Sequence, residues 1–344
     1  MPMTADCTRE ELLRDFRQAQ AGGGSRLVRM PRRAGGAMEF ARSVAAGLRR
    51  RPRRLDCRFL YDARGSELYE RICGQPEYYP TRTEAAILAA FATDICRATG
   101  PVTLLELGSG SSAKTGHLLG AYARAYGPLH YVPVDVSESA LRQAGHAIGG
   151  RYPEVRVTGI NSTYEEAFHF VPTVSPALVL FLGSTVGNLD EEEADGFWQA
   201  VSGRMQAGDY FLLGIDLVKD PAVIEAAYDD EAGVTAAFTR NLFARMNREL
   251  GAALDPDAIE HVARYRPERE RIEIHARFTR PQRIEIAPLG ESFAVGCGEE
   301  ILVEISRKFR LPALPAYFRG HGFQVRETYT DERGWFALLL LRKV

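Results

Sequence analysis

The sequence predicts an α/β fold, in which a mostly parallel sheet carries helices on both faces. Three observations favour it: apolar runs alternate with helical stretches between residues 102 and 216, a glycine-rich turn follows the first run, and an acid ends the second. The 344 residues exceed the roughly 100–200 of a usual domain, so we expect two packed units. With 45% apolar and 26% charged residues, the composition is that of a globular chain.

Each element of the α/β region follows from a local pattern. Apolar runs predict strands at 102–107, 130–134, 155–161, 177–182 and 210–216, and amphipathic stretches predict helices at 83–99, 114–126, 137–148 and 191–205. Two further strands, 324–329 and 335–342, are joined by a short turn, so we expect an antiparallel hairpin at the sheet edge. Such a terminal hairpin fits the Rossmann-like methyltransferase variant of the fold better than a dehydrogenase.

Residues 217–300 break this alternation. A helical stretch over 221–250 precedes strands expected at 259–265, 272–279 and 282–286, and the strand 301–309 continues their antiparallel sheet. These segments predict a second unit of α+β type, inserted into the first.

Composition and charge exclude several classes of protein. No apolar run approaches the ~18–20 residues of a membrane-spanning helix, and the N-terminus is charged where a signal peptide would be apolar. Five cysteines without a CxxC pair indicate reduced thiols in the cytoplasm, not a disulfide or zinc framework. The basic run 49–54 is compatible with nucleic acid, but it lacks interleaved aromatic residues, so a solvated segment is favoured. We therefore expect no metal, membrane or nucleic-acid partner.

A candidate cofactor site lies at the first strand–helix turn, Glu106–Ser112. Gly108 and Gly110 let the backbone approach a ligand beyond the carboxyl end of the strand, and Asp135 at the end of the second strand can accept hydrogen bonds from two ribose hydroxyls. The turn lacks the third glycine of a dinucleotide fingerprint, so the combination favours S-adenosylmethionine; a tight turn beside an exposed Asp is the alternative. Lys114 starts the next helix where acids are usual, which indicates an anionic partner such as the methionine carboxylate, or else a surface lysine.

Five longer segments resemble the ergothioneine-pathway histidine Nα-methyltransferases. They are RFLYDARGSELYERICGQPEYYPTRTEAAIL, LLELGSGSSAKT, LFLGSTVGNL, AYDDEAGVTAAFTRNLF and EEILVEISRKF, and they extend from about Arg58 toward the C-terminus in the expected order. The resemblance implies a Rossmann-like class I methyltransferase core with an inserted α+β substrate-binding domain. It also implies trimethylation of the α-amino group of L-histidine by S-adenosylmethionine, which gives the betaine hercynine in the first step of ergothioneine biosynthesis.

The same resemblance implies a set of site residues. On the substrate side these are Tyr61, Tyr69, Tyr78, Gly183, Asn188, Tyr228, Glu304 and Ser306. On the cofactor side they are Gly108, Ser109, Gly110, Lys114, Asp135, Thr163 and Tyr164, of which the last two stand where the family has an acidic–aromatic pair at the adenine.

The implied substrate roles divide between the two ends of histidine. Asn188 and Tyr228 would hold the carboxylate, and Tyr78 would lie beside the amine, so Tyr78 and Asn188 are the expected catalytic residues. Tyr61 would lie near the imidazole, whose nitrogens Glu304 and Ser306 would bind. Tyr69 replaces a common Phe and adds a hydroxyl.

The pair of residues expected at the imidazole also makes chemical sense. A neutral imidazole has one donor and one acceptor nitrogen, which suit a carboxylate and a hydroxyl respectively. Glu304 and Ser306 are two positions apart, so a strand places both on one face. Taken singly, each site residue has a structural explanation, such as packing for Tyr78 or a turn cap for Asn188.

The length thus divides into three predicted parts. We expect a flexible arm at 1–26, a substrate-binding domain from 27–82 and 217–307, and a cofactor-binding core from 83–216 and 308–344. The expected partners are L-histidine and its mono- and dimethyl intermediates, bound by a cytoplasmic monomer. An α-N-methyltransferase for another amino acid, such as tryptophan or tyrosine, is the alternative enzyme; an RNA-associated protein on the same scaffold is the alternative outside enzymes.

Overall fold

The computed structural model describes residue 14 and residues 16–18, 26–29 and 36–344. Its larger sheet has the strand order β1-β4-β3-β2-β5-β6-β13-β12, in which only β13 runs against the others. The strands are β1 (Arg26–Arg29), β2 (Thr103–Leu107), β3 (Leu129–Asp135), β4 (Val155–Asn161), β5 (Ala177–Phe181), β6 (Tyr210–Asp216), β12 (Phe323–Thr330) and β13 (Phe336–Lys343). The predicted α/β sheet with a C-terminal antiparallel hairpin is confirmed.

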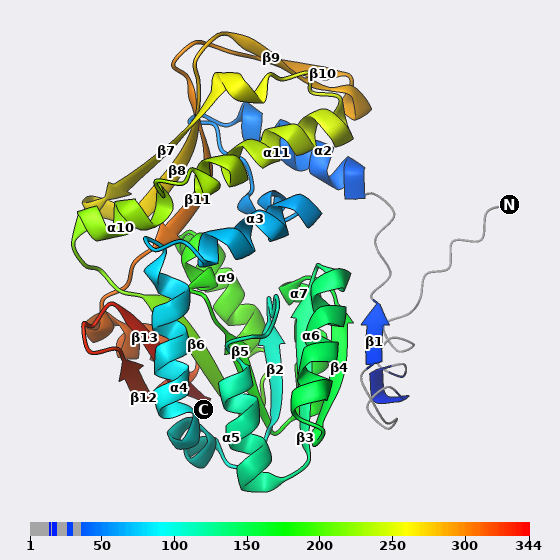
Figure 1. Cartoon of the computed structure of the whole chain (residues 1–344), viewed down its shortest axis with the longest axis vertical. Helices are drawn as coiled ribbons and strands as arrows, with labels where there is room; N and C mark the ends of the chain where they lie inside the picture. The colour runs from blue at the N-terminus through cyan, green and yellow to red at the C-terminus, as the bar shows by residue number, and fades with distance from the viewer. Residues whose placement is uncertain (1–13, 15, 19–25, 30–35) are drawn as a thin grey trace, which may run out of the picture.

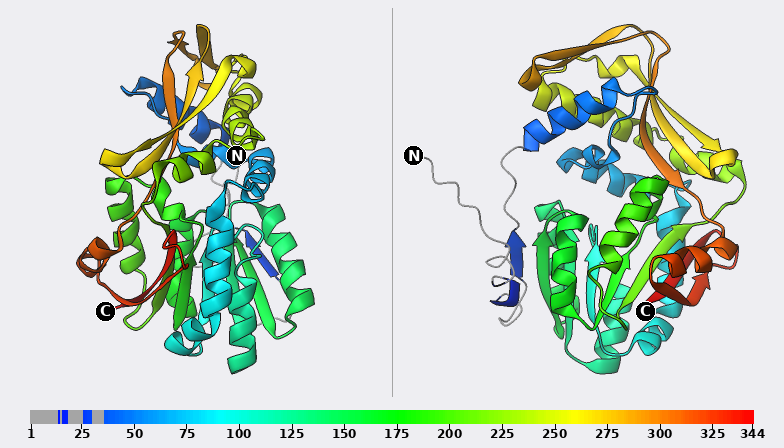
Figure 2. Two further views of the ribbon diagram at one scale, coloured as in Figure 1. Left: turned by 60° about the vertical axis from the view of Figure 1, so that its left-hand side comes forward. Right: turned by 180° about the vertical axis from the view of Figure 1, so that it is seen from behind.

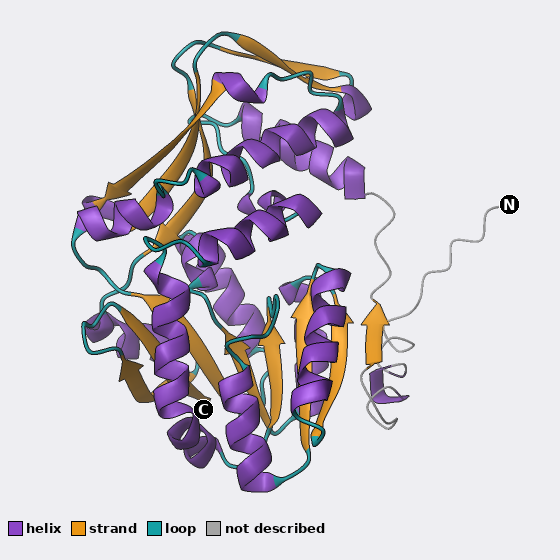
Figure 3. Ribbon diagram, viewed as in Figure 1, coloured by secondary structure: helices purple, strands orange, loops and turns teal. Residues whose placement is uncertain are grey.

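Helices cover both faces of this sheet because its strands are apolar on both sides. One face packs on α4 (Tyr79–Thr99), α5 (Gly116–Tyr126) and α6 (Glu138–Arg151), which lie in front of the sheet in Figure 3. The other face packs on short helices including α7 (Tyr164–Ala167) and α8 (Val171–Val174), and on α9 (Glu191–Ser202) and α12 (Leu314–Gly320). None of the helices in the described ranges has the length and apolar character needed to cross a membrane.

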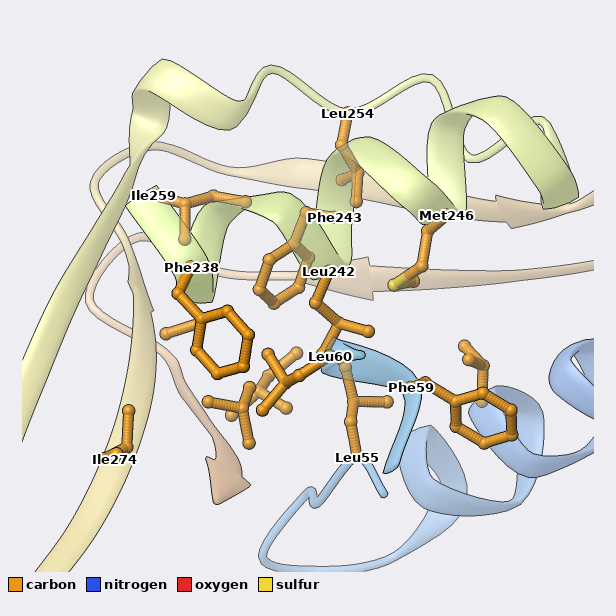
Figure 4. Packing of buried hydrophobic residues seen from close by; sticks show 14 of the residues in the cluster. Leu55, Phe59, Leu60, Phe238, Leu242, Phe243, Met246, Leu254, Ile259 and Ile274 are labelled. Atoms are coloured by element: carbon orange, nitrogen blue, oxygen red, sulfur yellow. The ribbon is translucent and has the colours of Figure 1, made fainter. Parts of the chain in front are cut away.

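The smaller unit lies beyond the carboxyl ends of the parallel strands (Figures 1 and 2). It combines a three-stranded antiparallel sheet, a two-stranded one and four helices. Its helices are α2 (Gly36–Arg49), α3 (Ala63–Cys73), α10 (Pro221–Tyr228) and α11 (Val234–Leu250); its strands are β7 (Ile259–Arg266), β8 (Arg271–Phe278), β9 (Gln282–Ile286), β10 (Glu291–Val295) and β11 (Glu300–Arg307). The apolar face of α11, with Phe238, Leu242 and Phe243, packs into its core (Figure 4).

One predicted helix, over 221–250, is wrong as a single element. It is interrupted between α10 and α11, where Gly233 takes a φ of 68°. The carboxylate of Asp230 accepts hydrogen bonds from the backbone N–H groups of Val234 at 2.7 Å and Thr235 at 2.7 Å, so it caps a new helix start. The interruption turns Tyr228, the last residue of α10, toward β11.

The N-terminal boundary of the smaller unit differs from the expected one. Residues 26–29 pair in parallel with β4 of the larger sheet, so the smaller unit starts with α2 and not at residue 27. Of the predicted arm, residues 1–13, 15 and 19–25 lie outside the described residues. Phe16 is buried, with its ring centroid 5.0 Å from that of Phe170, so this part of the arm packs on the larger unit.

The basic run 49–54 links parts of the fold. Arg49 pairs with Glu291 of β10, and Arg53, which is buried, pairs with Glu299 at 3.0 Å. Arg54 reaches the first turn of α9, where it pairs with Asp190 at 2.8 Å and Glu193 at 3.1 Å. The run therefore has intramolecular acidic partners from both units, which the sequence pattern did not reveal.

The two ends of the insertion pass side by side. Leu217 and Phe309 form an isolated parallel bridge, in which the backbone N–H of Phe309 donates to the carbonyl of Asp216 at 2.9 Å. The backbone N–H of Val218 donates to the carbonyl of Phe309 at 3.1 Å. The chain thus leaves the larger unit and returns to it at one place.

Candidate active site

The turn after β2 is shaped by two glycines and an acid. Gly108 and Gly110 have φ angles of 67° and 49°, which favour glycine. The carboxylate of Asp135 accepts a hydrogen bond from the N–H of Gly110 at 2.9 Å and from the N–H of Ser137 at 2.8 Å. Burial raises the pKa of Asp135, and these backbone donors oppose the shift. Asp135 therefore ties the turn to the start of α6 and keeps further lone pairs for a ligand.

The surroundings of this turn fit an adenosine-type ligand. A Cβ at Gly108 would lie 3.5 Å from the ring of Tyr164, so the glycine leaves a narrow space beside an aromatic face. The Oγ of Ser109 is buried and has no hydrogen-bond partner among the residues described. Thr163 precedes α7, and Tyr164 packs on Phe181 with ring centroids 5.4 Å apart. An aromatic wall, an unsatisfied hydroxyl and a carboxylate thus meet where the sequence predicts the cofactor.

Lys114 has a buried protein partner. Its ammonium forms an ion pair with Glu84 of α4, which is fully buried and also accepts from the N–H of Gly183 at 2.7 Å. Burial lowers the pKa of Lys114, but Glu84 outweighs this and raises it, so Lys114 stays charged. The anionic partner that the sequence indicated for Lys114 is a side chain here. A Cβ at Gly183 would lie 3.8 Å from the Lys114 ammonium and 4.0 Å from the Tyr69 hydroxyl.

Gly214 of β6 makes room for this ion pair. A Cβ there would collide with the carboxylate of Glu84 and lie 3.4 Å from the N–H of Gly183. We expect Gly214→Ala to destabilise the protein by about 1–3 kcal/mol, because an extra methyl group in a packed site forces side chains to move. Thermal unfolding checks this, with Gly196→Ala of α9 as the control, since a Cβ there meets no atom within 4 Å. Equal melting temperatures for the two variants would contradict the expectation.

An aromatic cavity lies in the smaller unit. Its wall contains five of the predicted substrate residues, namely Tyr61, Tyr69, Tyr78, Tyr228 and Glu304. Ile72, Ala227, Thr235 and Phe238 complete it. The rings of Tyr61 and Tyr69 pack edge to face with centroids 5.5 Å apart, and those of Tyr78 and Tyr228 with centroids 5.9 Å apart. Burial raises the pKa values of Tyr61, Tyr69 and Tyr78 well above 10, so their hydroxyls are neutral.

β11 carries one acid and one hydroxyl of the predicted site: Glu304 lines the cavity, and Ser306 is buried behind its wall. A register shift between Leu302 and Glu304 marks a bulge in the pairing with β8, and Ser306 follows two residues later on the same face. Burial raises the pKa of Glu304 to about 7, and Lys308 opposes the shift. The hydroxyl of Tyr228 donates to the Oγ of Ser306 at 2.9 Å. The predicted placement of Glu304 and Ser306 on one face of a strand agrees with this geometry.

The other three predicted substrate residues, Gly183, Asn188 and Ser306, lie outside the cavity wall. Asn188 ends a short 3-10 helix, Thr185–Asn188, which packs on β11 so closely that a Cβ at Gly187 would lie 2.9 Å from the Arg307 carbonyl oxygen. Asn188 is therefore held at the junction of the two units, near the strand that carries Glu304.

A buried charged cluster beneath the cavity was missed at the level of sequence. Asp216, at the end of β6, binds Lys308 at 2.9 Å and Lys219 at 2.5 Å, and it accepts from the Tyr79 hydroxyl at 2.7 Å. Lys308 has no exposed side-chain surface, and Asp216 has none either. The alternation Glu304, Ser306, Lys308 is the signal that could have found it, because all three positions share one face of an extended chain.

Comparison with known proteins identifies the group to which the chain is related. The family model described as histidine-specific, S-adenosylmethionine-dependent methyltransferases matches residues 40–343. The histidine N-alpha-methyltransferase of Mycolicibacterium smegmatis is 44% identical over 299 residues, which cover 87% of this chain and 93% of that protein. Its namesake from Mycobacterium tuberculosis is 42% identical over 308 residues, which cover 90% and 96%.

A more distant relative acts on a different amino acid. The 4-dimethylallyltryptophan N-methyltransferase of Claviceps purpurea is 29% identical over 214 residues, which cover 59% of this chain and 62% of that protein. The match of the family model over most of the chain, on a fold with the glycine-rich turn and acid already described, decides the assignment. The chain belongs to the S-adenosylmethionine-dependent, histidine-specific methyltransferase family.

Proposed function

We propose that the protein transfers three methyl groups in succession from S-adenosylmethionine to the α-amino group of L-histidine. The product is hercynine, and the reaction is the first step of ergothioneine biosynthesis. The observation that carries the proposal is the position of Glu304 and Ser306 two residues apart on one face of β11, with Glu304 in the wall of an aromatic cavity. A carboxylate and a hydroxyl match the two unlike nitrogens of a neutral imidazole.

The cofactor-binding residues have separate tasks in this proposal. Bound S-adenosylmethionine supplies an electrophilic methyl group, and its leaving thioether needs no acid. Asp135 holds the ribose hydroxyls, Gly108 and Gly110 allow the close approach of the backbone, and Ser109 offers its unpaired hydroxyl. Tyr164 and Thr163 lie beside the base. Because the cofactor is bound in one pose, its methyl group is aligned with the amine. Alignment of reacting groups lowers the barrier by up to roughly 7–11 kcal/mol, so it accounts for much of the rate.

The substrate residues orient a neutral amine. Asn188 donates to the carboxylate, and Tyr228 lies beside it with its own hydrogen directed to Ser306, while Tyr61 and Tyr69 line the ring pocket. Tyr78 presents a neutral hydroxyl to the amine, because burial raises its pKa. A neutral phenol accepts an N–H hydrogen bond without taking the proton, so the amine proton passes to solvent. The neutral amine has two N–H groups in the first round and one in the second. In the third round only the protonated dimethylammonium has an N–H to donate to Tyr78, and its loss to solvent frees the nitrogen for attack.

Removal of the Tyr78 hydroxyl is expected to impair the later rounds of methylation. We expect Tyr78→Phe and Asn188→Ala each to lower kcat about tenfold or more and to release mono- and dimethylhistidine, because a misoriented amine loses alignment. Mass spectrometry of the products measures this. Tyr79→Phe is the control, since its hydroxyl faces Asp216 and the loss should reduce stability without changing the product pattern. Unchanged trimethylation in both site variants would sink the proposed roles.

The substrate itself is tested with a panel of amino acids. The protein is incubated with S-adenosylmethionine and histidine, tryptophan, tyrosine or phenylalanine, and mass gains of one to three methyl groups are read. Histidine alone is expected to gain three. The alternative substrate is another aromatic amino acid, which the tryptophan-derived substrate in the name of the Claviceps relative favours. A mass gain of three methyl groups on tryptophan would establish it.

We also propose that the enzyme is a cytoplasmic monomer whose partners are L-histidine and its mono- and dimethyl intermediates. The division into a substrate-binding unit and a cofactor-binding core is part of the same proposal. Light scattering during size-exclusion chromatography measures the mass of the particle, and a dimer would contradict the monomer.

A further inference from the structure

Lys308 is a buried ammonium group beside the hydroxyls of Tyr228 and Ser306. It follows β11 and shares the face of Glu304 and Ser306. Its Nζ lies 2.9 Å from the Asp216 carboxylate, 2.9 Å from the Tyr228 hydroxyl and 2.9 Å from the Ser306 Oγ. A lysine ammonium has three N–H donors and no acceptor, so these contacts use all of its hydrogens.

The hydrogens of this network can be assigned. Lys308 donates to both hydroxyl oxygens, and Tyr228 donates its own hydrogen to Ser306 at 2.9 Å. The Ser306 oxygen thus accepts two hydrogen bonds, which fill both of its lone pairs. Its own hydrogen has to point to a third partner. The neighbouring cavity, with Tyr228 and Glu304 in its wall, is where a ligand can provide one.

The charge state of Lys308 is held by its anchor. Burial alone lowers the pKa of Lys308, but Asp216 and Tyr228 outweigh burial and raise it, so the ammonium keeps all three protons. Asp216 belongs to the larger sheet and Lys308 to the inserted unit. The donor is therefore fixed relative to both units.

We propose that Lys308 is a positioning residue that fixes Ser306 as a hydrogen-bond donor toward the bound amino acid. The site then accepts a ring with an acceptor nitrogen at this position and rejects a ring that presents N–H or C–H there. This inference rests on the proposed function, because it assumes that Ser306 faces the ring of the substrate.

Lys219 supplies a matched control. It is nearly buried and binds the same Asp216, but its other hydrogen bonds go to the Tyr79 hydroxyl at 2.7 Å and the Leu217 carbonyl at 2.5 Å. Removing it perturbs the same carboxylate without removing a donor to Ser306. If the loss of a buried lysine acts only through general structure, Lys308→Met and Lys219→Met should therefore have the same effect.

The experiment is a double-mutant cycle on histidine affinity. Isothermal titration calorimetry measures the dissociation constant of L-histidine in saturating S-adenosylhomocysteine for wild type, Lys308→Met, Ser306→Ala and the double variant. We expect Lys308→Met to weaken binding roughly 10–100-fold, since hydrogen bonds to charged groups are among the strong ones. In the Ser306→Ala background its effect should be much smaller, and Lys219→Met should change the constant by less than about twofold.

Several outcomes would overturn the inference. Additive effects of Lys308→Met and Ser306→Ala would show that the lysine does not act through the serine. An equal loss in Lys219→Met would assign the effect to structure. If Lys308→Met does not bind S-adenosylhomocysteine, Lys308→Gln replaces it, because the amide keeps N–H donors. The affinity of Lys308→Gln for histidine should lie between those of wild type and Ser306→Ala. An affinity below that of Ser306→Ala contradicts the role. A wild-type protein that binds S-adenosylhomocysteine but not histidine instead refutes the proposed function.

Discussion

Glu304→Ala is expected to weaken L-histidine binding about 100-fold at pH 8, with no change in the affinity for S-adenosylhomocysteine. Hydrogen bonds to ionised groups contribute about 1.5–3 kcal/mol, and removal of the carboxylate leaves a buried imidazole N–H without an acceptor. Calorimetric titration with histidine and with S-adenosylhomocysteine measures both affinities. Unchanged histidine affinity would refute the imidazole-binding role and favour a substrate with another ring.

The pKa of Glu304 adds a pH dependence to this result. Burial raises it to about 7, so the carboxylate takes up a proton as the pH falls through 7. The protonated form is a poor acceptor, so the dissociation constant of histidine should rise below that pH. The imidazole of free histidine titrates nearby, with an ordinary pKa of about 6.5. Glu304→Gln separates the titration of Glu304 from that of the free imidazole, because the variant loses only the part of the pH dependence that is due to Glu304.

The same raised pKa links Glu304 to stability. The folded-state pKa lies above the ordinary value of 4.5, so the folded protein binds the proton more tightly than the unfolded chain does. Its contribution to the free energy of unfolding is therefore present below pH 4.5 and is lost as the pH rises through 7. We expect Glu304→Gln to raise the melting temperature at pH 8 while it lowers histidine affinity. The ionised carboxylate thus lowers the stability of the protein and strengthens the binding of histidine.

Asp135→Ala is expected to raise the dissociation constant of S-adenosylhomocysteine about 100-fold. The substitution removes the acceptor for the N–H groups of Gly110 and Ser137, and it removes the proposed acceptor for the ribose hydroxyls. One lost hydrogen bond to a charged group costs about 1.5–3 kcal/mol, and a 100-fold loss corresponds to about 2.8 kcal/mol, so the loss of one bond to the ribose is sufficient. Calorimetry measures the affinity, and thermal unfolding measures the accompanying change in stability.

Asp190→Ala is the matched control for Asp135→Ala. Asp190 is also an acid at a helix start, where its carboxylate accepts from the N–H of Glu193 at 3.0 Å and pairs with Arg54. Its loss should destabilise α9 by about 0.5–2 kcal/mol without lowering the affinity for S-adenosylhomocysteine. An equal loss of S-adenosylhomocysteine affinity in both variants would contradict the assignment of Asp135 to the cofactor.

Local patterns were sufficient to predict much of the fold. The alternation of apolar runs and helical stretches predicted the strands and helices of the α/β core, and the resemblance of the longer segments predicted the family, which the comparisons confirmed. The cavity gathers Tyr61, Tyr78 and Glu304 as expected, although their individual roles stay predictions. These successes share one cause: periodicity and motif order are properties of neighbouring residues.

Features that depend on distant pairing were not predictable in this way. Glu84 of α4 and Lys114 of the turn before α5 have opposite charges, and nothing in either segment indicates that they meet in a buried site. The alternation of Glu304, Ser306 and Lys308 indicates that Lys308 shares their face, but its partner Asp216 lies far away in the chain, so the buried ion pair itself was not predictable. The helix break before Val234 depends on Asp230, whose capping bonds outweigh the helical propensity around it.

The adjacency of the two ends of the insertion has an evolutionary consequence. Because Leu217 and Phe309 lie side by side, the segment between them can lengthen, shorten or change its sequence while the larger sheet keeps its geometry. Mutations in the insertion can therefore change the part of the substrate site that it supplies, which includes Tyr228 and Glu304, while the methyl-donor site is inherited intact. Only residues that bridge the junction, Asp216 and Lys308 among them, have to change in step, and they mark where the diversification of such enzymes is constrained.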